Sequence, residues 1–136
     1  MKYLLDTNAC VDFLRGRSQK LIERLSQQAS SDVVVCSIVR AELFAGAYKS
    51  NETEKNFLEV EAFLKPYRTL PFDDSVAKVC GRVRADLEKT GKKIGPNDIA
   101  IAAIALANDL ILVTHNVGEF NRVEGLRIED WQAENR

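Results

Sequence analysis

The sequence has few of the residues that mark secreted, fibrous or low-complexity proteins. Its 136 residues include three cysteines, three prolines and seven glycines, which excludes a disulfide framework and a collagen-like composition. Cys10, Cys36 and Cys80 are widely spaced, and each lies in an apolar stretch. We therefore expect three buried free thiols in a reducing compartment, most simply the cytoplasm.

Long apolar runs are also missing. No stretch approaches the ~20 apolar residues of a membrane-spanning helix, and the apolar start of the chain stops at Asp6, too early for a signal peptide. We expect no membrane partner. Apolar residues make up 46% and charged residues 29%, which is typical of one globular domain over residues 1–136, with disorder expected only at 133–136.

An excess of one charge sign is absent, because 19 basic residues face 20 acidic ones. This balance excludes a broad basic surface for nucleic acid, so any such contact would come from a local basic patch. The chain has a single histidine and no cluster of cysteine and histidine, which makes a zinc site improbable.

Hydrophobic periodicity predicts strands that alternate with helices. Thr7 or Asn8 would cap the first helix, and Ser37 the third. The predicted strands are 2–5, 33–36, 68–72, 110–113 and 126–128, the predicted helices are 9–15, 18–29, 37–48, 51–64, 73–90 and 97–108, and 114–123 is a loop or short helix. This alternation is typical of an α/β fold with a parallel sheet.

Four polar clusters fall where ligands bind to parallel sheets, at the carboxyl ends of strands. They are Asp6-Thr7-Asn8, Glu42, Asp98, and Thr114-His115-Asn116 with Glu119. Each has a plainer explanation: Asp6 as a helix cap, Asp98 favoured by the helix dipole, Glu42 and Glu119 as solvated charges, and His115 as an exposed loop residue. Their joint placement at one sheet edge favours a functional site.

Such carboxylates need a cation between them. Two carboxylates ~5 Å apart repel by roughly 3 kcal/mol at an effective dielectric near 20, and each raises the pKa of the other. Oxygen ligands of this kind suit Mg²⁺ or Mn²⁺.

Four segments, taken in order, resemble the motifs of PIN domains, and most closely those of the VapC toxins of bacterial toxin–antitoxin pairs. They are Leu4-Leu5-Asp6-Thr7-Asn8, Ser37 to Leu43 with Gly46, Ile94 to Ala102 with Ala105, and Val113 to Phe120 followed by Val123 to Trp131. The resemblance implies a three-layer α/β/α fold around a short, mainly parallel sheet of four to five strands. It also implies Mg²⁺- or Mn²⁺-dependent cleavage of RNA, a cognate VapB-like antitoxin, and a homodimer or larger heteromer.

Within this resemblance, Asp6, Glu42 and Asp98 match the acidic positions of the family. The fourth motif departs from the commonest pattern, in which an Asp follows the Thr by two residues. Asn116 stands at that place and Glu119 is the nearest acid, so either could complete the site.

As a mechanism we expect Asp6 and Asp98 to hold the metal directly, with Glu42 and Glu119 acting through water or on a second ion. Orienting hydrogen bonds would come from Thr7, Asn8, Thr114 and Asn116. A weak RNA-binding patch is expected at Arg82, Arg84, Lys92 and Lys93, unless Arg82 pairs with Asp86 on a solvated helix face. The substrate would be structured RNA, such as a tRNA or ribosomal RNA loop.

Two other functions remain open from the residues. An aspartate-dependent phosphatase or phosphotransferase also places an Asp after its first strand, but it usually has a second Asp where Asn8 stands. A non-catalytic PIN-like module that binds proteins would have no need for Asp6, Glu42 and Asp98.

Overall fold

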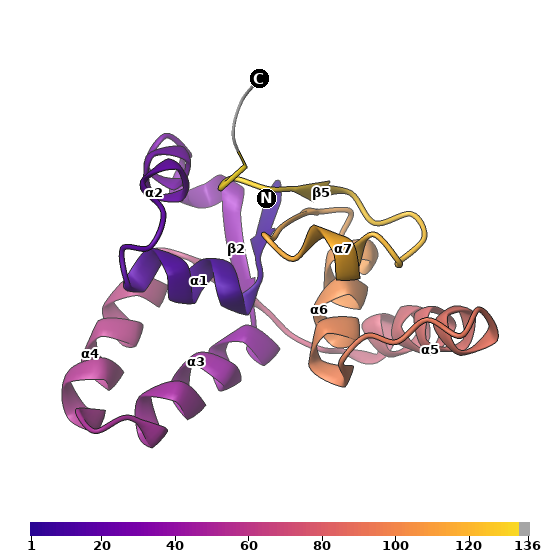
Figure 1. Cartoon of the computed structure of the whole chain (residues 1–136), viewed down its shortest axis with the longest axis horizontal. Coiled ribbons are helices and arrows are strands. Elements are labelled where there is room, and N and C mark those ends of the chain that lie inside the picture. The colour runs from indigo at the N-terminus through magenta and orange to yellow at the C-terminus, as the bar shows by residue number, and fades with distance from the viewer. Residues whose placement is uncertain (134–136) are drawn as a thin grey trace.

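The protein is built around a parallel sheet of five strands (Figure 1). The computed structural model describes residues 1–133. The strand order is β3-β2-β1-β4-β5, and every neighbouring pair is parallel. This confirms the predicted α/β class and the upper limit of five strands. The strands are β1 (Tyr3–Leu5), β2 (Val33–Cys36), β3 (Arg68–Leu70), β4 (Ile111–Val113) and β5 (Ile128–Glu129).

The two strands at the centre of the fold are covered on both faces. Every residue of β1 and β2 is buried. Side chains alternate between the faces of a strand, so a fully buried strand needs helices above and below it. This is the physical basis of the predicted helix–sheet–helix layering. In register, Leu4 pairs with Val34 on one side and Leu112 on the other.

Seven α-helices connect or flank the strands within the described residues. The second is followed by a short 3₁₀ turn at Ser30–Asp32. The helices are α1 (Thr7–Leu14), α2 (Gln19–Ser26), α3 (Ser37–Lys49), α4 (Thr53–Leu64), α5 (Asp74–Lys89), α6 (Pro96–Ala107) and α7 (Val117–Phe120). Helix α6 is central to the fold, because its residues 101–105 are completely buried.

The caps predicted at Thr7 or Asn8 and at Ser37 were wrong, whereas the alternative role of Asp6 as a helix cap is confirmed. Asp6, not Thr7 or Asn8, caps α1, because its carboxylate accepts a hydrogen bond from the Ala9 N–H at 2.7 Å. Ser37 is the first residue of α3, and the residue before it offers no side-chain cap. In both places the helix begins directly after the strand, so the cap falls one residue earlier than a search for Ser, Thr or Asn suggests.

Several boundaries also moved. Strand β3 ends at Leu70 rather than Phe72, and β5 begins at Ile128 rather than Leu126. Cys10 and Cys36 are buried free thiols as expected, but Cys80 is only half-buried. The cause is the position of Cys80 on α5, a helix with just one face on the core.

The aromatic residues of α3 and α4 form a small layer of their own. Phe57 packs against Phe44 and Tyr48 at ring distances of 5.1 and 5.8 Å. Phe44, Phe57 and Phe63 are half-buried, whereas Tyr48 is 64% exposed. Of these four aromatic residues, only Tyr48 is left largely open to solvent.

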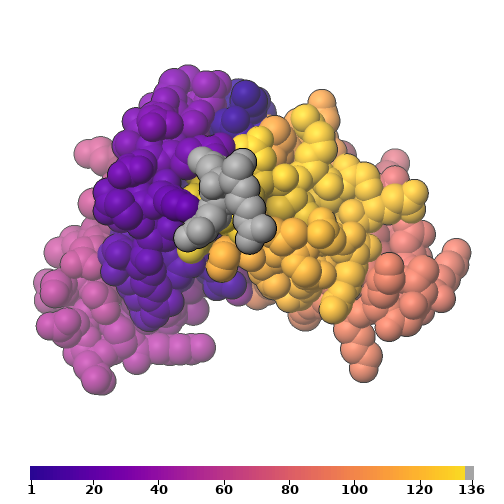
Figure 2. Space-filling view, turned by 45° about the horizontal axis from the view of Figure 1, so that its top comes forward, coloured from indigo at the N-terminus to yellow at the C-terminus, as the bar shows by residue number. Residues whose placement is uncertain are grey.

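The last described residues return to the start of the chain. On the face shown in Figure 2, the C-terminal segment in yellow lies beside the N-terminal helices in indigo and purple. Trp131 packs edge-on against Tyr3, and the Gln132 amide donates to Asp12 at 3.0 Å. Disorder was expected at 133–136, and residues 134–136 of this range lie outside the described residues. Residues 1–133 contain no helix with the length and apolarity needed to cross a membrane.

Candidate active site

Four acidic side chains from distant parts of the chain meet at the carboxyl edge of the sheet. Asp6 follows β1, Glu42 lies on α3 after β2, Asp98 is in the first turn of α6, and Glu119 is on α7 after β4. The charge of Asp98 raises the pKa of Asp6, and the charges of Glu119 and Glu42 raise that of Asp98. Each of these effects joins Asp98 to one of the other three acids, so Asp98 is the centre of this group, which we call the acidic cluster.

Asp6 is the most deeply placed of these acids, with 3% of its surface exposed. Burial raises its pKa from 3.8 to about 6, and the charge of Asp98 adds to this effect. Hydrogen bonds from the Thr114 side chain and the Ala9 N–H act in the opposite direction. The loss of hydration outweighs both bonds, so the carboxylate is held in a position that disfavours its charge.

Asp98 lies half-buried at the start of α6, behind Gly95 and Pro96. Burial is again the largest cause that raises its pKa to about 6, followed by the charge of Glu119 and then that of Glu42. The helix dipole favours a negative charge at this end of α6 and would lower the pKa of Asp98. Burial and the neighbouring acids have the larger effect, so the pKa is raised.

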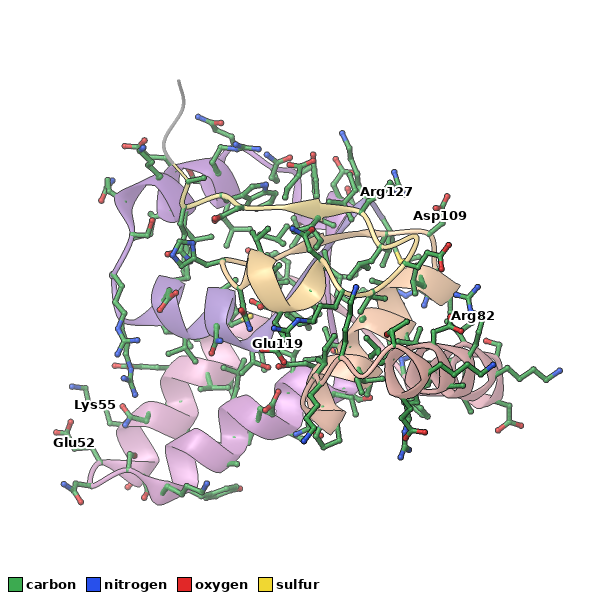
Figure 3. All side chains as sticks on the ribbon, turned by 45° about the vertical axis from the view of Figure 1, so that its right-hand side comes forward. Glu52, Lys55, Arg82, Asp109, Glu119 and Arg127 are labelled. Carbon is green, nitrogen blue, oxygen red and sulfur yellow. The ribbon has the colours of Figure 1, made fainter. Side chains whose placement is uncertain are left out.

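Glu42 and Glu119 each accept hydrogen bonds from other residues of the predicted site or from the segment before α6. The Thr7 hydroxyl donates to Glu42 at 2.6 Å, which joins the start of α1 to α3. Glu119 accepts from the Asn116 amide at 2.7 Å and from the Gly95 N–H at 3.2 Å. Figure 3 shows Glu119 beneath α7, in line with its bond to the segment that leads into α6.

The remaining residues of the polar clusters have different surroundings. Thr114 is buried, and its hydroxyl accepts from the Asn116 N–H at 3.0 Å. Asn8, predicted to orient the carboxylates, is exposed. His115 is exposed as expected and faces Asp130, with 3.0 Å between its ring Nδ1 and a carboxylate oxygen.

This donor set fits a hard divalent cation. None of the ion pairs within residues 1–133 involves Asp6, Glu42, Asp98 or Glu119, so no lysine or arginine neutralises the cluster there. In the same described region, no three acidic, cysteine or histidine side chains are drawn together tightly enough to enclose an ion. A cation at this site would therefore be held by one or two carboxylates, with waters and phosphate completing its shell, as is usual for Mg²⁺.

The predicted basic patch is divided by the structure. Arg84, Lys92 and Lys93 line one surface depression beside Ile94 and the first residues of α6. Arg82 does not line it, and Figure 3 shows Arg82 on α5, well away from Glu119. No ion pair between Arg82 and Asp86 forms among the described residues.

Sequence reasoning missed Arg122, which donates to the main-chain oxygen of Lys93 at 2.6 Å. The segment before α6 is therefore bonded twice to this part of the chain, through Lys93 to Arg122 and through Gly95 to Glu119. The spacing of three residues between Glu119 and Arg122 is the signal that could have suggested a shared face.

A groove between α1, α3 and α4 opens beside the acidic cluster. It has a volume of about 140 Å³. Apolar and charged residues both line it. The lining residues include Val11, Leu14, Leu43, Ala47 and Val60, with Arg15, Glu42 and Glu59 as the charged members. Glu42 is a member of the acidic cluster and also lines the groove, so the groove adjoins the cluster at Glu42.

The sequence of this chain is similar to those of known proteins over nearly its whole length. A family model described as PIN domain matches residues 3–126. Ribonuclease VapC2 of Haemophilus influenzae strain Rd is 42% identical over 131 residues, covering 96% of this chain and 98% of the relative. The tRNA(fMet)-specific endonuclease VapC of Salmonella typhimurium is 37% identical with the same coverage.

Solved structures agree with this family. DNA-bound VapBC from Salmonella typhimurium contains a chain that superposes with a TM-score of 0.92 at 37% identity, over 96% of this chain and 98% of that one. VapBC2 from Rickettsia felis, bound to a promoter DNA fragment, gives a TM-score of 0.90 at 34% identity, with 96 and 99% coverage. From the family model, the full-length relatives and the shared fold, the chain belongs to the PIN-domain family, as a VapC ribonuclease toxin of the VapBC toxin–antitoxin systems.

Proposed function

We propose that the acidic cluster is the active site of a Mg²⁺- or Mn²⁺-dependent endoribonuclease, in which Asp6 and Asp98 hold the metal and Glu42 assists through water. The observation that carries this proposal is a set of acids without a basic partner: the charge of Asp98 raises the pKa of the buried Asp6, and the charges of Glu119 and Glu42 raise the pKa of the half-buried Asp98. A divalent cation would reverse that penalty and favour both carboxylates in their charged form. Neither a phosphatase nor a purely structural module accounts for relatives named as ribonucleases.

The chain's own groups would position this chemistry. Thr114 and the Ala9 N–H hold Asp6, and Thr7 holds Glu42. When bound, a divalent ion would activate the attacking water and stabilise the charge that builds on the phosphate. Hydrolysis by water would leave a 5′-phosphate and a 3′-hydroxyl and would need no second histidine.

We further propose a structured RNA, and specifically tRNA, as the substrate. Two relatives at 37% identity are named tRNA(fMet)-specific endonucleases. Arg84, Lys92 and Lys93 would contact the RNA backbone near the start of α6, which also carries Asp98. Contacts of this kind with phosphates give affinity without reading the sequence, so they fit recognition of RNA by shape.

The test is cleavage of tRNA by the purified protein in the presence of Mg²⁺, Mn²⁺ or EDTA. Asp6→Asn and Asp98→Asn should each reduce cleavage by more than about a hundredfold while the fold stays intact, because removing a carboxylate that holds a metal removes several kcal/mol of charge stabilisation. Asp74→Asn, at the exposed start of α5, is the matched control. Full activity of either site variant, or undiminished cleavage in EDTA, would disprove the metal assignment.

A protein partner belongs to the same proposal. The structures from Salmonella typhimurium and Rickettsia felis are named as VapBC bound to DNA and VapBC2 bound to a promoter DNA fragment. We propose that a cognate VapB-like antitoxin binds this chain with an amphipathic segment in the groove between α1, α3 and α4, and reaches the cluster through Glu42. A homodimer or larger heteromer, and a cytoplasmic location, remain predictions.

A further inference from the structure

The basic depression between α5 and α6 has an apolar lining, which a site for phosphate alone does not need. Its volume is about 310 Å³, and four of its eight lining residues are apolar: Leu87, Ile94, Pro96 and Ile99. Leu87 and Ile99 are buried, so the apolar surface open to a ligand belongs mainly to the half-buried Ile94 and the exposed Pro96. A lining of apolar side chains with a few polar groups is typical of sites for small organic groups, and a nucleobase is such a group.

The charged residues of the depression have no ionic partner within residues 1–133. Arg84, Glu88, Lys92 and Lys93 line it, and none of them takes part in an ion pair there. Arg84 and Glu88 are four residues apart on α5, a spacing at which opposite charges often pair on a helix. Because they do not pair, three cations are available to phosphates and one carboxylate is available to a hydrogen-bond donor.

The segment that forms one side of the depression is held in place by main-chain bonds. Helix α5 ends in a turn at Gly91, which has a φ of 68°, and the Lys92 N–H donates to the Leu87 carbonyl at 3.0 Å. The Lys93 carbonyl accepts from Arg122 at 2.6 Å. The depression is therefore formed before a ligand binds, so little conformational entropy is lost on binding.

The depression also adjoins the acidic cluster. Pro96 and Ile99 line it from the first turn of α6, and Asp98 stands between them in the chain. One turn of an α-helix rises only about 5.4 Å, and α5 leads directly into this turn (Figure 1). A nucleotide in the depression would therefore be a neighbour of the phosphodiester bond that is cleaved at the cluster.

We infer that the depression is a subsite for one unpaired nucleotide of the RNA, beside the cleaved bond, and that Glu88 is a specificity-determining residue in it. The base packs on Ile94 and Pro96, the three cations face the phosphates, and Glu88 accepts a hydrogen bond from an amino group of the base. Carboxylates accept from the cytosine amino group in this way, whereas uracil has no amino group. Only an unpaired base can offer its face and edge together. This assignment rests on the proposed ribonuclease function and adds a base-reading group to it.

Binding of short single-stranded RNAs, oligocytidylate and oligouridylate, tests the role of Glu88. Fluorescence anisotropy in EDTA measures both affinities without cleavage. The parent protein should bind oligocytidylate at least about fivefold more tightly, the lower end of what a well-placed base contact contributes. Glu88→Ala should abolish this preference by weakening oligocytidylate alone. A carboxylate that only repels phosphates predicts the opposite, namely tighter binding of both RNAs by the variant.

The matched control is Asp86→Ala. Asp86 is an exposed acid on the same helix that does not line the depression. Its removal reports what the loss of one nearby negative charge does by itself, and the preference for oligocytidylate should remain.

A second variant tests the apolar surface. Ile94→Ser should weaken both RNAs by about fivefold or more, because an apolar contact is lost. The slope of log affinity against log salt should stay unchanged, because no phosphate contact is removed. Thermal melting shows whether this half-buried position still folds, and Glu88→Ala, at an exposed helical position, keeps the test independent of that result.

Equal binding of the two RNAs by the parent protein, or tighter binding of both by Glu88→Ala, would overturn the subsite while leaving tRNA cleavage in Mg²⁺ intact. A parent protein that shows the expected preference but does not cleave tRNA in Mg²⁺ or Mn²⁺ would retain the nucleotide subsite and contradict the proposed function.

Discussion

At the scale of single residues, Asp6 has two roles that oppose each other energetically. Its carboxylate caps α1, which stabilises the first helix, and it is also 97% withdrawn from water in a cluster of acids. A pKa raised from 3.8 to about 6 corresponds to roughly 3 kcal/mol of stability lost when the group ionises. Residues placed against the stability of the fold in this way are typical of functional sites.

The sign of this effect makes a prediction about pH. Because the folded pKa of Asp6 lies above the unfolded value, the folded state binds more protons between pH ~4 and ~6, and stability falls as pH rises through that window. Asp6→Asn keeps a capping oxygen and removes the charge. Without metal, the variant should gain up to about 3 kcal/mol over the parent at pH 7.5 and almost nothing at pH 4.

Urea denaturation in EDTA at the two pH values measures this difference, with Asp74→Asn as the exposed control. A gain that stays constant between pH 4 and pH 7.5 would show that the buried charge is not its source.

At the scale of elements, the segment between α5 and α6 connects the basic depression to the acidic cluster. Lys92 and Lys93 line the depression, Gly95 donates to Glu119, and Arg122 holds the Lys93 carbonyl. One short segment therefore carries both the proposed RNA contacts and the approach to Asp98. The fixed main chain allows the lysine side chains to be changed without releasing the segment.

The double variant Lys92→Ala with Lys93→Ala should raise KM for tRNA and reduce the slope of log affinity against log salt by about one to two, because each lost phosphate contact removes roughly one released counterion. kcat should change little, since neither side chain belongs to the acidic cluster. The control is Arg82→Ala, a cation on α5 outside the depression. Binding of tRNA measured at several salt concentrations decides the point, and an equal effect of Arg82→Ala would contradict a local patch.

Local patterns predicted the elements well and their ends less well. Continuous apolar runs such as Val33 to Cys36 identified buried strands. The range predicted for α5, 73–90, agrees with its observed caps, because Asp73 caps the start of the helix and Gly91, at positive φ, follows its end. The caps predicted at Thr7 or Asn8 and at Ser37 were misplaced because a buried strand leads into each helix without a loop. Asp6 stands at the junction of the two elements, because its N–H still donates to Val113 in β4 while its carboxylate already caps α1.

At the scale of the whole molecule, the groove between α1, α3 and α4 gives the proposed antitoxin a defined place to bind. Gly46 lines this groove, and a side chain added there would meet no atom within 4 Å. Gly46→Leu should therefore fill the groove, and it should stabilise the free protein by roughly 1 kcal/mol through helix propensity. Gly81→Leu on α5 is the matched control, equally open but outside the groove.

The partner that co-purifies with the parent protein from its host should be lost from Gly46→Leu and kept by Gly81→Leu, with both variants melting at or above the parent temperature. Mass spectrometry of the purified complexes supplies the measurement. Retention of the same partner by Gly46→Leu would place the antitoxin elsewhere.

The amino-acid sequence alone determined the α/β class, the elements, the family resemblance, and which strand ends supply Asp6, Glu42, Asp98 and Glu119. These features follow from local periodicity and from residue types next to strands, which the linear order preserves. The tertiary structure decided what depends on neighbours from distant segments. These features are the order of the strands, the separation of Arg82 from Lys92 and Lys93, the hydrogen bond from Arg122 to the Lys93 carbonyl, and the hydrogen bonds that Glu119 accepts from Gly95 and Asn116. Hydrogen-bond partners and burial depend on contacts between segments that are distant in the sequence. They can therefore be determined only once the strands and helices are packed together.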